Sequence, residues 1–294
     1  MKLSQNFKVI GLLLGILLAG CQEEKGVSRS DSPPSRVVTL SPAITEMLYE
    51  LGCQDRIVGV TRFCRYPTAA REKACVGGFL DPNYEAIFKL RPDSVLIPVG
   101  ADELRQTLER YDQNVLEIPQ RSLEDVYFSL RLLGKTFGVE SRAEAKIAEM
   151  QRELAEVAEK SRGKKLRRVL MVVGRDYQSE RLEEVYIVGK DGLCNPLLEM
   201  AGGKNVYNGE TPFPKISEEA ILQMNPEVIL EIQPCETQQP ANEALSRKAW
   251  ERLSEVEAVQ KGRIFLMKGE PPLLPSPILT HWVKYLAELL QKER

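Results

Sequence analysis

The side chains best suited to chemistry in this sequence are arginines and aromatic residues in apparent loops. Arg62 and Arg65 flank Phe63 in one loop, and Arg175 lies two residues before Tyr177 in another. Guanidinium groups pair well with carboxylate and catecholate oxygens, and aromatic rings pack on flat apolar ligands. This combination favours binding of a sizeable ligand over catalysis.

Signatures of catalysis and of nucleotide binding are missing from the sequence. It contains no G-x-G-x-x-G, G-x-x-x-x-G-K-[ST], G-x-S-x-G or H-E-x-x-H motif. The single histidine, His281, lies beside Trp282 on a predicted amphipathic helix, where a packing or surface role is the simplest interpretation. One histidine argues against a catalytic triad and against a receptor that holds bare metal ions through several histidines. We therefore predict no catalytic residues, no metal ligands and no resident cofactor.

Five of the six cysteines remain after Cys21 is set aside, namely Cys53, Cys64, Cys75, Cys194 and Cys235. An odd number leaves at least one unpaired, even in an exported protein. Cys64 and Cys75 are the candidate disulfide, because they are close in sequence and both near predicted strand ends. The alternative is that all five are free and mostly buried.

One long predicted helix, residues 141–161, organises the elements that position these loops. Ser141 and Glu144 match a capping box, and Gly163 follows as a left-handed stop. Apolar residues recur on one face at spacings of four and three: Ala143, Ile147, Met150, Leu154 and Val157. At about 1.5 Å per residue the helix is roughly 30 Å long. We interpret it as a brace between two lobes, the alternative being an ordinary surface helix.

A repeat on both sides of this helix supports two related lobes. Residues 83–96 align without gaps on residues 217–230, with Glu-Ala-Ile, Pro and Leu at matching places. Each copy predicts a short helix capped by Asn83 or Ser217, a stop before proline, and a buried strand.

Strands and helices alternate in both halves, which predicts an α/β fold with two parallel-sheet lobes. The predicted strands are 36–40, 56–60, 94–98 and 115–119 in the first lobe, and 168–173, 185–188, 228–232 and 264–267 in the second. The predicted helices are 44–51, 84–90, 103–111 and 123–137, then 196–201, 218–224, 246–258 and 278–290. The boundaries are 36–138 for the first lobe, 139–163 for the linking helix and 164–294 for the second lobe.

Ligands bind beyond the carboxyl ends of strands in such sheets. We therefore expect a ligand cleft between the lobes. Its predicted contacts are Ser41, Pro42, Phe63, Tyr66, Phe79, Arg175, Tyr177 and Phe213.

The amino terminus predicts export and lipid anchoring. Residues 1–20 combine Lys2 and Lys8 with a short apolar run, as in a signal peptide. The ending Leu18-Ala19-Gly20-Cys21 resembles a bacterial lipobox, so Cys21 is the predicted lipidation site, and 21–35 is a predicted flexible tether. The 40 basic and 42 acidic residues give a net charge of −2, with no basic patch for nucleic acid.

Several segments together resemble the helical-backbone (class III) periplasmic binding proteins, the receptors of ATP-driven importers for cobalamin and ferric siderophores. The matching segments are 36–46, 58–61, 66–67, 76–79, 90–93 and 201–206. The resemblance implies two α/β lobes rigidly linked by a long helix, and binding and delivery without catalysis. It also implies permease and ATPase subunits as partners, and a monomer on the periplasmic or cell-surface side of a membrane. A corrinoid is the preferred ligand, with a ferric siderophore or a haem-type iron complex as the alternative.

The resemblance also assigns a role to two acids. Glu85 and Glu219 match family positions that dock onto arginines of the permease. The Pro-Arg pair of many members is absent, because Ile278 follows Pro277 here. Two other classes stay open: a chelatase-like metal enzyme with Cys64, Cys75 and Cys235 as soft ligands, and a structural lipoprotein without a ligand.

Overall fold

The computed structural model describes residues 32–177, 179–182, 184–232, 243–267 and 273–291. The chain divides into two units, Met1–Ser32 and Pro33–Arg294, and everything below concerns the second. The predicted signal peptide, Cys21 and most of the tether lie outside the described residues. Within these ranges, no helix has the length and apolar character needed to cross a membrane.

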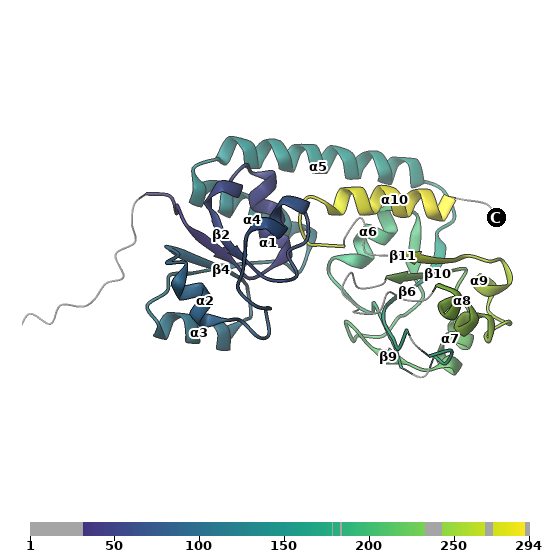
Figure 1. The fold of residues 1–294 in the computed structure, drawn as a ribbon. Helices are drawn as coiled ribbons and strands as arrows, with labels where there is room; N and C mark the ends of the chain where they lie inside the picture. Colours follow the sequence, from purple (N-terminus) through teal and green to yellow (C-terminus); the bar gives the residue numbers. More distant parts are fainter. Residues whose placement is uncertain (1–31, 178, 183, 233–242, 268–272, 292–294) are drawn as a thin grey trace, which may run out of the picture. The chain divides into compact units, whose positions relative to one another are not determined.

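The first lobe is built on a fully parallel sheet, as predicted, with strand order β3-β2-β1-β4-β5 (Figure 1). Its strands are β1 Val37–Thr39, β2 Ile57–Val60, β3 Ala74–Cys75, β4 Ser94–Pro98 and β5 Val115–Ile118. The α-helices are α1 Pro42–Glu50, α2 Tyr84–Lys89, α3 Asp102–Arg110 and α4 Leu123–Phe137. Two short 3-10 helices, Gln54–Arg56 and Thr68–Glu72, precede β2 and β3. Strand β3 escaped prediction because it has two residues, both exposed, and so shows no apolar run.

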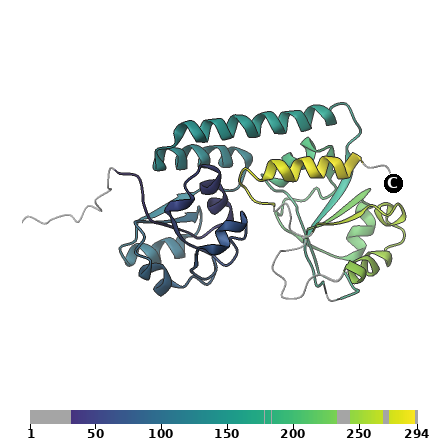
Figure 2. The same cartoon turned by 45° about the horizontal axis from the view of Figure 1, so that its top comes forward.

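The linking helix α5, Glu140–Ser161, buries its predicted stripe of Ala143, Ile147, Met150, Leu154 and Val157. It packs on α4, on α6 Cys194–Met200 and on α10 Leu279–Gln291 (Figures 1 and 2). Helices α4 and α5 approach closely at Gly134, where an added Cβ would lie 2.7 Å from that of Ala143. The buried face of α5 belongs to one core cluster that includes Ile44 of the first lobe and Trp282 of the second. The helix is therefore a brace and not an isolated surface helix.

The predicted carboxyl end of this helix is confirmed, and its predicted amino end is wrong. Gly163 adopts a φ of +73° and ends the helix as predicted. The predicted Ser141–Glu144 capping box is wrong, because the helix begins at Glu140, and the N-cap residue is Val139, which provides no side-chain cap. Glu144 instead pairs with Arg131 of α4, at 2.7 Å.

The second lobe contains a mixed sheet, so the prediction of a parallel sheet is wrong there. The order is β11-β10-β6-β7-β9, with β8 also paired to β6. The strands are β6 Arg167–Gly174, β7 Val185–Ile187, β8 Gly203–Asn205, β9 Lys215–Ile216, β10 Val228–Ile232 and β11 Ile264–Met267. Strand β7 runs antiparallel to β6 and β9 antiparallel to β7. The segment between β6 and β7 is too short for the helical crossover that a parallel pair needs.

Helices of the second lobe follow the prediction with one exception. Besides α6 and α10 they are α7 Glu218–Met224, α8 Glu243–Glu251 and α9 Glu257–Gln260. The single helix predicted over 246–258 is thus two helices separated by a turn. The buried Leu253 and Val256 of that turn continued the apolar periodicity and concealed the break.

The internal repeat is confirmed in atomic detail. The Asn83 side chain accepts a hydrogen bond from Ala86 N at 3.0 Å, and Ser217 Oγ accepts one from Ala220 N at 3.4 Å. Arg91 and Asn225, which precede the matching prolines, have φ values of 47° and 42°. The strands that follow, β4 and β10, lie beside the first strand of their respective lobes, β1 and β6.

Candidate functional site

All five strands of the first sheet end at one edge, because they are parallel, and this edge is the candidate site. Ser41, after β1, donates a hydrogen bond from Oγ to Gln120 Oε1, after β5, at 3.1 Å. The amide Nε2 of Gln120 is buried and has no hydrogen-bond partner among the described residues. Since buried donors are nearly always paired, this amide makes Gln120 a candidate contact at this edge.

Next to Gln120, Arg121 extends the same edge. Its guanidinium lies near Gly100, which follows β4: a Cβ added to Gly100 would be 3.1 Å from Arg121 Nη2. The Arg121 side chain is exposed and makes no ion pair within the described part of the chain. A Cβ on Gly192 would lie 3.0 Å from the Arg121 carbonyl oxygen, so a second-lobe loop packs against this part of the edge.

The loop after β3 is a tight turn that presents an apolar tip. Gly77 has a φ of +92° and bridges to Pro82. Leu80 at the tip is 92% exposed, whereas the predicted contact Phe79 is half-buried and packs on the core of its own lobe. Leu80 is thus the more accessible apolar group of this loop.

The loop after β2 is fixed by an ion pair. Arg62 makes two hydrogen bonds to Asp81, at 2.8 and 2.7 Å, and stacks on Phe63 at 5.5 Å from the ring centroid. Gly78 leaves room for this pair, because a side chain at that position would displace Asp81 and Arg62. Phe63 is therefore held at the edge by a defined contact.

Of the remaining first-lobe predictions, Ser41 is nearly buried and Pro42 is the first residue of α1. Tyr66 lines a different, small cavity of about 40 Å³ with Glu46, Lys146 and His281, where α1, α5 and the start of α10 meet. The structure therefore groups Ser41 and Phe63 with the edge and places Tyr66 toward the junction of the lobes.

Arg175 and Tyr177 follow β6 as predicted, but both are engaged inside the second lobe. The Arg175 side chain is 1% exposed and pairs with the fully buried Glu231, Nε to Oε1, at 3.0 Å. Ser246 Oγ accepts a hydrogen bond from Arg175 Nη2 at 2.6 Å and donates one to Glu231 Oε1. The other carboxylate oxygen, Glu231 Oε2, accepts a hydrogen bond from Trp250 Nε1 at 2.6 Å. Arg175 stacks on Tyr177 at 4.9 Å, and burial raises the pKa of Tyr177 to about 12. In this structure neither side chain is offered to a ligand.

Phe213 is 55% exposed, but it lies two residues before β9, at the amino end of that strand. Its segment runs beside Val188, with backbone hydrogen bonds from Ile187 to Pro214 and from Gly189 to Pro212. Because β7 is antiparallel, the assumption that placed Phe213 at a carboxyl edge does not hold. The segments after β10 and β11, 233–242 and 268–272, lie outside the described residues.

The cysteines with described positions are free thiols, so the candidate Cys64–Cys75 disulfide is not formed in the structure. Cys64 is buried and contacts the hydroxyls of Thr45 and Thr61, at 3.1 and 3.2 Å, while Cys75 is exposed. Burial raises the pKa of the Cys64 thiol. Over the described ranges, no group of three or more His, Cys, Asp or Glu residues could hold a metal ion. Cys235 lies outside these ranges.

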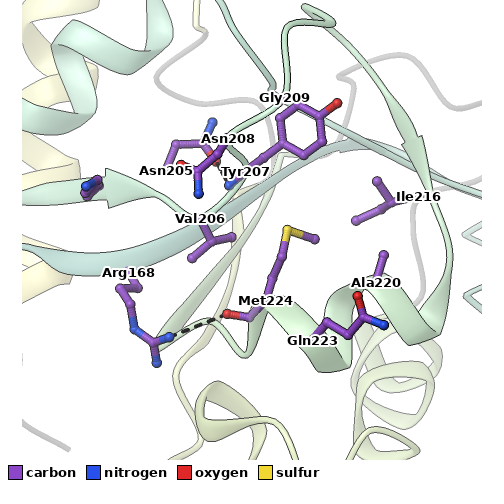
Figure 3. Close-up of a pocket in the computed structure, with 11 residues that line it drawn as sticks. Arg168, Asn205, Val206, Tyr207, Asn208, Gly209, Ile216, Ala220, Gln223 and Met224 are labelled. Atoms are coloured by element: carbon purple, nitrogen blue, oxygen red, sulfur yellow. Dashed lines mark hydrogen bonds between the residues drawn. The ribbon is translucent and has the colours of Figure 1, made fainter.

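A further cavity, of about 570 Å³, lies within the second lobe between β6, the segment after β8 and α7 (Figure 3). Arg168 donates a hydrogen bond to the Met224 carbonyl oxygen at 3.5 Å, and Tyr207 and Gln223 also line the cavity (Figure 3). None of the predicted contact residues lines this cavity.

A model of the periplasmic binding protein family matches residues 37–271. The chain belongs to this family. It is 28% identical to the ABC transporter substrate-binding lipoprotein YvrC of Bacillus subtilis, over 87% of this chain and 79% of that protein. It is 31% identical to a cobalamin-binding protein of Halobacterium salinarum, over 68% of this chain and 54% of that protein.

Solved structures confirm the fold of this periplasmic binding protein. The vitamin B12 binding protein BtuF of Vibrio cholerae superposes with a TM-score of 0.73 at 18% identity, covering 88% of this chain and 97% of that one. A periplasmic heme binding protein of Pseudomonas aeruginosa superposes with a TM-score of 0.75 at 22% identity, covering 89% of this chain and 94% of that one.

The two predicted docking acids occupy equivalent places in this periplasmic binding protein. Glu85 lies in the first turn of α2 and Glu219 in the first turn of α7, and both are exposed. The nearby Ser217 hydroxyl holds the pKa of Glu219 below its usual value, so this acid is ionised at neutral pH. An exposed carboxylate at a helix amino terminus is also favoured locally by the helix dipole.

Sequence reasoning missed Gln120, Arg121, Gly192 and Leu80. A signal for two of them was present: Gln120 and Arg121 directly follow the predicted strand 115–119, so they had to lie at the same edge as Ser41. Gly192 gave no signal, because its place depends on how the lobes pack through α5.

Proposed function

We propose that this periplasmic binding protein binds a corrinoid at the edge of its first sheet, in a cleft completed by the second lobe, and delivers it to a membrane permease. The buried amide of Gln120, which has no hydrogen-bond partner among the described residues, carries this proposal together with Phe63 and Arg121 of the same sheet edge, because a corrinoid combines a broad apolar ring with peripheral amide oxygens that accept hydrogen bonds. Cobalamin-binding relatives support the same ligand class. The corrinoid is cargo, with no resident cofactor and no catalytic step.

A second candidate ligand is haem or a ferric chelate. The similar fold of heme-binding proteins and the exposed guanidinium of Arg121 favour it. Because guanidinium pairs with carboxylates and catecholates, such a ligand would contact the edge through its oxyanions.

Replacing Phe79 with alanine tests whether the loop after β3 contacts the ligand. Truncating an aromatic anchor costs about 2 kcal/mol or more, so cobalamin affinity should fall roughly 30-fold by calorimetry. Because Phe79 also packs on its own lobe, a thermal melt must accompany the titration, and Leu80→Ser tests the same loop without disturbing the core. Phe128→Ala, an exposed aromatic on α4, is the matched control. Parent affinity in both loop variants would remove this loop from the site.

We further propose that Glu85 and Glu219 dock the loaded protein on arginines of the permease, with an ATPase subunit driving import. Changing both to glutamine should lower uptake in cells roughly tenfold or more while ligand affinity in vitro stays at the parent value, since charges at an interface rim govern docking. Glu103→Gln with Glu124→Gln removes two exposed acids from the first turns of α3 and α4 as a control. Unimpaired uptake in the Glu85/Glu219 variant would refute the docking role.

Anchoring through a lipid on Cys21 completes the proposal and places a monomeric protein on the outer side of a membrane. Its support is the lipobox-like ending of the apolar run. Cys21→Ser should move the protein from the membrane fraction to the soluble fraction after export. Unchanged fractionation would place the anchor elsewhere.

A further inference from the structure

The segment between β2 and β3, together with the last residue of each strand, lines a cavity of about 360 Å³ whose wall is strongly basic. Arg62, Arg65, Arg71 and Lys73 all contribute to its walls. Val60 pairs in parallel with Cys75, so both strands deliver their carboxyl ends here. Arg62 and Arg65 follow β2 and so lie at the edge where ligands bind in parallel sheets, whereas Arg71 and Lys73 precede β3 and complete the lining of the cavity.

Arg71 and Lys73 carry the part of this positive charge that has no acidic partner among the described residues. Asp81 neutralises Arg62 through two hydrogen bonds, at 2.8 and 2.7 Å. Arg71 donates from Nε to the Arg65 carbonyl oxygen at 3.2 Å, which satisfies one N–H but supplies no negative charge. Lys73 makes no ion pair within the described part of the chain, and Glu72, its neighbour in sequence, does not line the cavity.

The floor of the cavity supplies no anion either. Thr61 and Cys64 line it, and their side chains contact each other at 3.2 Å. Because burial raises the pKa of the Cys64 thiol, this sulfur stays neutral at physiological pH. The described lining residues include no carboxylate.

Like charges that share a small volume repel one another, and an anion between them removes that cost. The chain as a whole is slightly acidic, with a net charge of −2, so the basic excess is local. We propose that this cavity binds an oxyanion group, a phosphate or a carboxylate. Resting on the proposed function, the inference adds that the cavity receives the anionic substituent of the transported ligand.

Two titrations of the full-length protein test the inference. The first uses inorganic pyrophosphate, followed by calorimetry, with the parent and with Arg71→Gln/Lys73→Gln. Loss of two charges should weaken binding roughly tenfold or more, and raised salt should weaken parent binding as well. Lys89→Gln/Arg110→Gln removes two exposed charges at a distance from the cavity and should bind like the parent.

The second titration identifies the source of the oxyanion. Cobalamin carries a phosphodiester that cobinamide lacks, so a preference for cobalamin that disappears in Arg71→Gln/Lys73→Gln assigns the cavity to that phosphodiester. A preference for haem or a ferric catecholate that disappears in the same variant assigns it to carboxylate or catecholate oxygens.

If the parent does not bind pyrophosphate, or if parent and variant bind it equally, the oxyanion inference is wrong. The proposed function is then tested separately, by whether the protein binds a corrinoid or an iron chelate. If pyrophosphate binding depends on Arg71 and Lys73 but no corrinoid or iron chelate binds, the oxyanion site is upheld and the proposed function fails.

Discussion

Arg175→Met is expected to lower the free energy of unfolding by about 3–5 kcal/mol, because it leaves the buried carboxylate of Glu231 without its cation. The Arg175 and Glu231 side chains are 1% and 0% exposed, and water cannot replace the lost partner. The hydroxyl of Ser246 and the indole N–H of Trp250 still donate to the carboxylate, but neither carries a charge. Denaturant unfolding followed by circular dichroism measures the loss.

Matched variants separate the buried pair from ion pairs in general. Arg131→Met breaks the pair with Glu144, whose side chains are 51% and 59% exposed, and should cost about 1 kcal/mol or less. The double variant Arg175→Met/Glu231→Leu should be less destabilised than the sum of the two single variants, because it leaves no buried charge. Equal costs for Arg175→Met and Arg131→Met would show that the cluster around β6, β10 and α8 does not hold the second lobe together.

Glu46→Gln is expected to remove a strong pH dependence of stability. Glu46 is 1% exposed, and its Oε1 accepts a hydrogen bond from the Ile278 backbone N–H at 3.1 Å, which ties α1 to the start of α10. Its Oε2 has no partner among the described residues. Burial, above all, raises the pKa of this carboxyl from 4.5 to about 8, with a smaller contribution from Glu50.

The sign of the effect follows from that raised pKa. Between about pH 4.5 and pH 8 the folded protein keeps the Glu46 proton and the unfolded chain releases it, so stability falls as pH rises. The slope is about 1.4 kcal/mol per pH unit, or on the order of 4 kcal/mol between pH 5 and pH 8. Glutamine cannot ionise but keeps the acceptor for Ile278, so Glu46→Gln should lack this contribution.

Unfolding measured across this pH range in parent and Glu46→Gln isolates the contribution of Glu46 as their difference. Lys146, Glu149, Glu153 and His281 also face the small cavity beside Glu46, and His281→Gln is the control for titration of that neighbour. Parallel pH profiles for parent and Glu46→Gln would mean that the Glu46 carboxyl is ionised in the folded protein.

Local patterns in the sequence predicted the elements well where a single physical rule decided them. The stripe from Ala143 to Val157 fixed the buried face of the brace, and the caps at Asn83 and Ser217 fixed the starts of α2 and α7. These features depend on neighbours within one or two turns, which the sequence displays directly.

The site was less predictable because it depends on strand direction and on long-range partners. Antiparallel β7 moved Phe213 away from the expected edge, since the alternation of strands and helices alone does not fix direction. Arg175 was predicted to contact a ligand, but it pairs with Glu231, a partner far along the chain that the sequence does not indicate. The place of Gln120 after the predicted strand 115–119 indicated the edge, but its contact with Ser41 became known only from the structure.

Native mass spectrometry of the full-length protein with cobalamin, haem and a ferric siderophore tests the central claim most directly. We expect one cobalamin per chain, a weaker adduct with the iron complexes, and a reduced cobalamin adduct in Gln120→Leu but not in Gln106→Leu, an exposed glutamine on α3. An adduct with haem or the siderophore in preference to cobalamin would contradict the corrinoid assignment, and the absence of any adduct would contradict the binding function proposed for this site.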